Sequence, residues 1–76
     1  MSAGPRLHFR RHRRLTPGDV KEHYDVYLGD WMIGETWRMD DGWRVFGQGL
    51  RNRTAPSRAA AGELIAERAR QRRADG

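Results

Sequence analysis

The sequence has no cysteine, and lysine occurs only once among its fifteen basic residues. Without cysteine the chain can form neither a disulfide nor a thiolate-bound metal site. The absence also argues against a small secreted scaffold, because disulfides usually hold such domains together. We therefore expect a cytoplasmic protein.

Long apolar runs are missing too. No stretch approaches the ~20 residues of a membrane-spanning helix, and the arginine-rich N-terminal segment is followed by no apolar signal-peptide core. We therefore expect no membrane partner. The 76 residues make at most one domain. A chain of this size buries only roughly 60% of its unfolded surface, so its core is expected to be thin.

The sequence is rich in arginine, and its charged residues are grouped in blocks of like sign. Residues 1–18 have a net charge of +5 and no acid, residues 19–43 have a net charge of −5, and residues 44–62 have a net charge of +4. Separated charge creates a directional field, so the pattern favours a charged partner. Codon bias in a GC-rich genome also favours arginine over lysine, so the clustering is better evidence than the arginine count.

Apolar and polar residues alternate between residues 23 and 48, which predicts a three-stranded antiparallel meander. The expected strands cover residues 24–28, 31–38 and 43–46. Gly29 and Gly42 are expected in the two turns, because glycine accepts the positive φ that tight hairpin turns need. Gly34, inside the second strand, indicates a bulge or a close approach of another backbone.

A basic loop is predicted over residues 50–56, followed by a helix. Thr54 and Ser57 compete as its N-cap. The apolar stripe of the helix consists of Ala61, Leu64, Ile65 and Ala69. The smallest fold that buries both this stripe and one sheet face is α+β, a three-stranded antiparallel β-meander with one C-terminal α-helix packed on one face.

The N-terminal segment is compatible with two structures. Leu7 and Phe9 alternate as in an edge strand, whereas the five arginines repel one another and favour a disordered basic arm. The expected organisation is a basic N-terminal arm or extra strand (1–18), a single β-β-β-α domain (19–71) and a basic C-terminal tail (72–76).

Three groups of arginines are candidate nucleic-acid-binding residues. The arm can follow a phosphate backbone, the loop precedes a helix N-terminus that attracts anions, and two further arginines lie on neighbouring strands. The arm contributes Arg6, Arg10, Arg11, Arg13 and Arg14, the loop Arg51, Arg53 and Arg58, and the sheet Arg38 and Arg44. The prediction is a non-catalytic accessory module that binds nucleic acid, DNA ahead of RNA, largely through electrostatic contact with phosphates.

The alternative is a small protein-interaction or regulatory module of phage type. Its surface would combine an exposed aromatic residue with the acidic hairpin, namely Trp31, Glu35, Asp40 and Asp41. Trp31 is expected to be exposed because one short helix cannot cover all the aromatic residues. Contact between the acidic hairpin of one copy and the basic arm of another would give weak, salt-sensitive self-association instead of a monomer.

Neither catalysis nor a cofactor is expected. No nucleophile with an adjacent base, paired carboxylates or Gly-rich phosphate loop is recognisable. His8 and His12 would approach one metal ion only in a helix, which the arginines around them disfavour, and a third ligand is missing. We therefore expect no metal site.

Four motifs carry a family resemblance: YDVYLGDW, IGETWR, DGWRVFG and TAPSRAAAGELIAERA. In outline they resemble small β-β-β-α modules of actinobacterial and actinophage genomes, and the arm-type DNA-binding domains of tyrosine integrases. The resemblance implies a three-stranded sheet that enters the major groove with a helix behind it. The family's sheet presents basic residues, whereas this one is acidic, so Arg38 and Arg44 alone could read bases from it.

Overall fold

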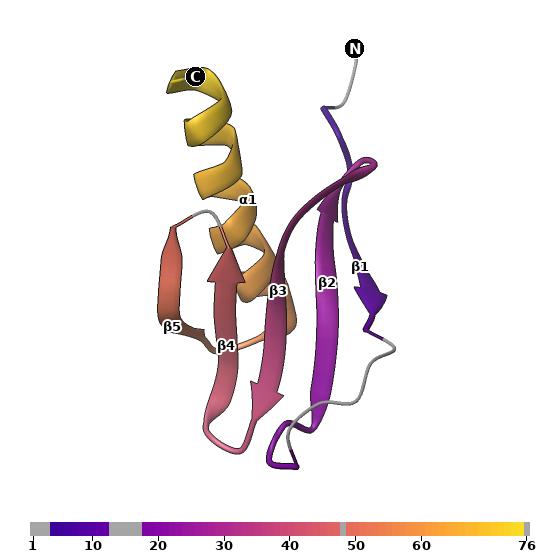
Figure 1. Cartoon of the computed structure of the whole chain (residues 1–76), viewed down its shortest axis with the longest axis vertical. Helices are drawn as coiled ribbons and strands as arrows, with labels where there is room; N and C mark the ends of the chain where they lie inside the picture. Colours follow the sequence, from indigo (N-terminus) through magenta and orange to yellow (C-terminus); the bar gives the residue numbers. More distant parts are fainter. Residues whose placement is uncertain (1–3, 13–17, 48, 76) are drawn as a thin grey trace.

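The structure is a computed structural model that describes residues 4–12, 18–47 and 49–75, with only the backbone described at positions 51, 52, 74 and 75 (Figure 1). Within these residues, five strands precede one helix. The elements are β1 (Leu7–Arg11), β2 (Glu22–Leu28), β3 (Trp31–Met39), β4 (Gly42–Gly47), β5 (Leu50–Ala55) and α1 (Arg58–Asp75).

The strands form one antiparallel sheet in which they follow one another in chain order, β1-β2-β3-β4-β5. Helix α1 lies across one face of this sheet (Figure 1). The α+β class and the C-terminal helix are therefore confirmed, while the prediction of three strands is wrong because a further strand flanks each side of the central meander. Among the described residues, no helix combines the length and the apolar composition needed to cross a bilayer.

Strand β5 replaces the basic loop predicted over residues 50–56. It pairs with β4, so that Ala55 lies opposite Trp43 and Arg53 opposite Val45. Leu50 and Ala55, at its two ends, are buried. Between them the sequence is polar, and this edge strand therefore lacks the alternation by which a half-buried strand is predicted.

Strand β1 resolves the other open alternative, since residues 7–11 form an edge strand paired with β2. Leu7 and Phe9 pack against the buried core. The guanidinium groups of Arg10 and Arg11 lie 5.6 and 5.8 Å from the ring centres of Tyr27 and Tyr24. These cation–π contacts offset part of the repulsion that argued against a strand.

Helix α1 begins after Ser57, whose Oγ accepts a hydrogen bond from the backbone N–H of Ala60 at 3.1 Å. Ser57 is therefore the N-cap. The competing assignment of Thr54 is wrong, because Thr54 lies within β5, opposite Arg44 in the sheet.

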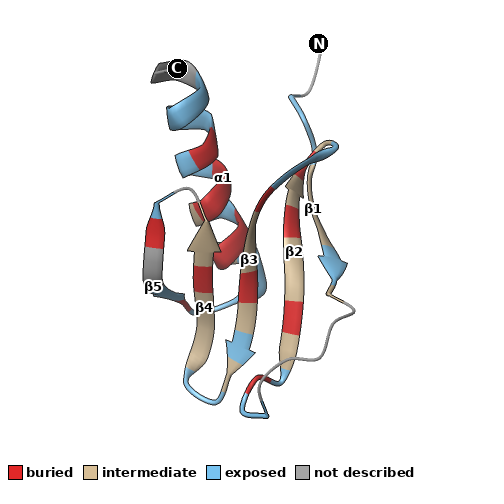
Figure 2. Cartoon of the chain, in the orientation of Figure 1, coloured by how far each residue is buried: buried red, intermediate tan, exposed pale blue. Residues whose placement is uncertain are grey.

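Small residues bring α1 close to the sheet. Ala61, Ala66 and Ala69 are fully buried, and a Cβ atom added to Gly62 would lie only 2.5 Å from the ring of Phe9. Figure 2 shows buried positions along α1 and on strands β2, β3 and β4. The predicted apolar stripe is confirmed, with Leu64 half-buried at its margin.

A β-bulge interrupts the pairing of β2 with β3. Val26 lies opposite Gly34 and Tyr27 opposite Met32, so Ile33 is the extra residue. A Cβ atom at Gly34 would lie 2.3 Å from the backbone oxygen of Phe46. Both expectations for Gly34, a bulge and a close backbone approach, are thus confirmed.

Candidate functional site

The face of the sheet that α1 does not cover is rich in polar and aromatic side chains. Val26 and Leu28 belong to the core beneath α1, so the alternating residues of β2 point to the opposite side. We call this side the open face. Pairing across the strands assigns to it His8, Arg10, His23, Asp25, Tyr27, Glu35, Trp37, Arg44 and Phe46, and stacking on His23 adds His12.

Aromatic rings pair along the open face. His8 stacks on Tyr27 with ring centres 5.3 Å apart, and Trp37 packs on Phe46 at 4.7 Å. The Nε2 atom of His8 also lies 2.7 Å from the backbone oxygen of Gly29, which fixes the ring at the start of β1. Trp37 also packs against His23, which stacks on His12, so four rings form a row across the open face beside the His8–Tyr27 pair.

Arginines from two distant parts of the chain meet at the β1 side of the sheet. The guanidinium carbon of Arg58, at the start of α1, lies 4.8 Å from the ring centre of Tyr24, and that of Arg11 lies 5.8 Å from the same ring. Arg6 and Arg58 also line one shallow hollow. We call Arg6, Arg10, Arg11 and Arg58 the basic edge.

The basic edge combines residues that the sequence placed in two separate groups. Arg58 was assigned to the loop before the helix, yet it lies beside the arginines of the predicted arm. Arg53 instead lies on β5, at the other edge of the sheet. The side chain of Arg51, and Arg13 and Arg14 altogether, lie outside the described residues.

Acidic residues pair with the two arginines that were candidates for base contacts. The Arg38 guanidinium donates to Glu22 at 2.6 Å, and that of Arg44 donates to Asp41 at 3.2 Å. These pairs are partly exposed, so each contributes little stability. They do occupy donors that a base contact would require, which leaves the basic edge as the stronger candidate surface.

Glu22 has two hydrogen-bond donors. The Tyr24 hydroxyl donates to one carboxylate oxygen at 2.6 Å and Arg38 to the other at 2.6 Å. These hydrogen bonds, Tyr24 first and Arg38 second, lower the pKa of Glu22 below its ordinary value of 4.5. Because the folded state lowers this pKa, the associated stability is present above pH 4.5 and is lost as the pH falls through the folded-state value.

Glu22→Gln is therefore expected to reduce the dependence of the free energy of unfolding on pH under acidic conditions. Urea unfolding between pH 7 and pH 3 should show a smaller loss of stability below pH 4.5 than in the wild type. The control is Glu67→Gln, at an exposed position of α1. This assignment would be contradicted if Glu22→Gln lost as much stability at low pH as the wild type, or if the control lost as little as Glu22→Gln.

The residues of the alternative interaction surface are spread along β3. Trp31 is 41% exposed, as expected, and the adjacent Met32 is 44% exposed. Trp31 begins β3, whereas Asp40 and Asp41 follow its end. Asp40 pairs with Lys21 at 3.1 Å. The structure therefore does not gather Trp31 and the acidic residues on one surface.

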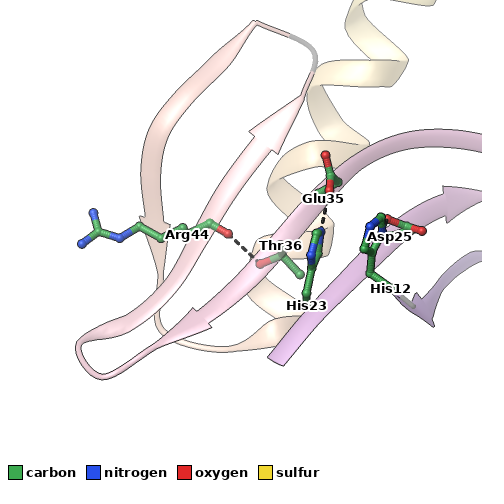
Figure 3. A network of polar contacts seen from close by, with 6 residues as sticks. All are labelled: His12, His23, Asp25, Glu35, Thr36 and Arg44. Atoms are coloured by element: carbon green, nitrogen blue, oxygen red, sulfur yellow. Dashed lines mark hydrogen bonds and ion pairs between the residues drawn. The ribbon is translucent and has the colours of Figure 1, made fainter. Parts of the chain in front are cut away.

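Four side chains, three from strands β2 and β3 and one from the residue that follows β1, form a polar cluster on the open face (Figure 3). The ligand atoms of His12, His23, Asp25 and Glu35 all lie within 4.8 Å of one another. Nδ1 of His12 lies 2.9 Å from Asp25 Oδ1, and Nε2 of His23 lies 2.5 Å from Glu35 Oε1. The prediction that the histidines lack further ligand-type neighbours is wrong, because the neighbours come from adjacent strands rather than from local spacing.

Comparison with protein-family models, curated proteins and solved structures found no match to this chain. The function is therefore argued from its residues.

Proposed function

We propose that this chain is a non-catalytic nucleic-acid-binding module whose basic edge lies along a phosphate backbone. The observation that carries the proposal is the convergence of Arg11 and Arg58 on the ring of Tyr24. Because arginine on an aromatic face keeps its N–H groups available at the rim, such a pair can still donate to phosphate oxygens.

The charge pattern of the surface supports the same partner. Three of the acidic residues, Glu22, Asp40 and Asp41, pair with a lysine or an arginine within the protein. Among the described residues, no carboxylate lies within ion-pair distance of the basic edge. A polyanion approaching β1 therefore meets guanidinium groups that no carboxylate contacts directly, and the acidic hairpin is partly neutralised.

The expected binding is electrostatic and weakly specific for sequence. DNA is the first candidate, in keeping with the outline resemblance to arm-type domains, but contact along a strand edge differs from insertion of a basic sheet into the major groove. Phosphate contacts position a protein without reading bases, and their number sets the salt dependence of affinity.

The proposal predicts that the triple change Arg10→Ala, Arg11→Ala and Arg58→Ala weakens binding to duplex DNA strongly and about equally across sequences. Each lost phosphate contact should reduce the slope of log affinity against log salt by about one. Fluorescence anisotropy at ~50 to ~200 mM salt measures both quantities, with single-stranded DNA and structured RNA as parallel ligands.

A matched control removes the same charge elsewhere. Arg53→Ala, Arg68→Ala and Arg70→Ala change three exposed arginines of β5 and α1 and should leave the slope close to that of the wild type. Equal losses in the two triple variants would mean diffuse attraction rather than a site. No binding of the wild type at low salt would overturn the proposal.

The second candidate function is protein interaction through Trp31, a large aromatic side chain that is 41% exposed. An exposed aromatic of this kind suits a protein partner better than a phosphate backbone. This candidate predicts that Trp31→Ala leaves DNA affinity and unfolding unchanged while weakening a protein complex. A loss of DNA affinity in Trp31→Ala would contradict it and assign Trp31 to base stacking.

A further inference from the structure

The polar cluster of the open face brings like charges together. Asp25 of β2 lies directly opposite Glu35 of β3, and two carboxylates in such positions repel each other. The rings of His12 and His23 stack with centres 4.0 Å apart and planes inclined by 15°. Two imidazoles at this distance also repel each other if both are protonated.

A divalent cation balances these charges better than protons do. With both imidazoles in the neutral form that binds metals, the two carboxylates leave a charge of about −2 in a partly buried site. Side-chain exposure is 7% for His23, 17% for Asp25 and 21% for His12. One divalent ion neutralises the pair of carboxylates and uses the imidazoles as neutral ligands.

The donor set indicates which ions suit the site. Two imidazole nitrogens and two carboxylate oxygens are ligands for zinc and for neighbouring divalent transition metals, whereas magnesium prefers oxygen ligands and water. Ligands of a tetrahedral zinc ion lie ~3.3 Å apart, given bond lengths of about 2.0–2.1 Å. Separations of up to 4.8 Å in the cluster therefore need only small side-chain rotations.

We infer that His12, His23, Asp25 and Glu35 form a binding site for one divalent transition-metal ion, with zinc as the reference metal. The ion takes the place of the hydrogen-bonded protons between each histidine and its carboxylate. Nδ1 of His23 is buried without a hydrogen-bond partner. A zinc ion bound to Nε2 of His23 requires the ring proton to be on Nδ1. Because Nδ1 has no partner in either tautomer, this shift of the proton does not increase the number of unsatisfied buried atoms.

The site has a structural consequence for the edge of the sheet. His12 follows β1, while His23 and Asp25 belong to β2 and Glu35 to β3. One ion bound to all four side chains therefore fastens the edge strand to the two strands beside it. This inference is independent of the proposed function, since no nucleic acid takes part in it.

The test is a titration of untagged, metal-stripped protein with Zn²⁺ near pH 7.5, followed by calorimetry and by thermal unfolding. The wild type should bind one equivalent with a Kd of about 10 μM or tighter, and its unfolding midpoint should rise with zinc concentration. Mg²⁺ should produce neither effect. Co²⁺ in place of Zn²⁺ reports the ligand geometry through its visible spectrum.

Two variants probe the ligands. Glu35→Gln retains an oxygen that can accept a hydrogen bond from His23 but is a much poorer metal ligand, and His12→Gln removes one imidazole. Each should weaken zinc binding at least about tenfold. The matched control is His8→Gln, on the same face of β1 but outside the cluster, and it should bind zinc like the wild type.

The outcomes separate clearly. One equivalent of zinc, lost in Glu35→Gln and His12→Gln and kept in His8→Gln, supports the inference. No zinc binding by the wild type overturns it, as does binding that survives in both ligand variants or disappears equally in the control. A fall in the unfolding midpoint with zinc would also overturn it, because the ion would then prefer the unfolded chain.

Discussion

Gly34→Ala is expected to destabilise the protein strongly, by about 3 kcal/mol or more. The added Cβ would lie 2.3 Å from the backbone oxygen of Phe46 and 3.0 Å from Cγ2 of Ile65. The oxygen belongs to the neighbouring strand, so relief requires β3 and β4 to separate. Overpacking alone typically costs about 1–3 kcal/mol, and loss of strand pairing adds to it. A domain of this size has a stability of only ~4–11 kcal/mol.

The measurement is urea unfolding followed by tryptophan fluorescence and far-UV circular dichroism. Gly18→Ala is the matched control, because a Cβ there would meet nothing within 4 Å; it should be neutral or slightly stabilising. A Gly34→Ala protein as stable as the control would show that β3 and β4 approach less closely than described.

Ile65→Ala is expected to cost about 2–5 kcal/mol, the range for truncating a buried isoleucine. Ile65 is fully buried and is the largest of the fully buried side chains among the described residues. Three of the residues one turn away from it on α1 are Ala61, Gly62 and Ala69, which are too small to fill the space that it leaves. In a thin domain this cavity removes a large share of the total stability.

A graded series checks the cavity explanation. Ile65→Val should cost about 0.5–1.5 kcal/mol, and Leu64→Ala, at a half-buried position of the same helix, should cost less than Ile65→Ala. If the variants unfold with the same m-value, their urea midpoints give the differences in the free energy of unfolding directly. Equal losses at Leu64 and Ile65 would mean that α1 rotates relative to the sheet.

The central meander could be predicted because its signals are local. Gly29 and Gly42 adopt positive φ values of 59° and 131°, as the turns require, and the alternation around them marks the strands. Of the two outer strands, alternation offered β1 only as one of two alternatives and did not indicate β5. β1 depends on cation–π contacts between strands, and β5 buries only its ends.

The polar cluster escaped prediction for a geometric reason. A regular hairpin from the Gly29 turn places residue 34 opposite Asp25 and points Glu35 to the other face. The bulge at Ile33 shifts the register by one residue, so Glu35 lies opposite Asp25 instead. One inserted residue moves every later side chain to the opposite face. Gly34 marked the irregularity, but not its direction.

The basic edge could not be predicted from the sequence for a different reason. Arg11 and Arg58 are distant in the sequence, and their approach depends on how α1 lies over β1. No spacing rule relates them. The arginines themselves were identified as candidates, while their grouping needed the tertiary structure.

The chain-order meander also shapes how the protein folds. Each strand pairs with its successor, so most of the sheet can form from contacts between residues close in sequence, which favours rapid folding. The packing of α1 on β1 instead closes a loop that includes the whole sheet, and such long closures carry the largest entropic cost. The arginines of β1 and α1 therefore come together late, and the basic edge belongs to the completed fold rather than to any part of it.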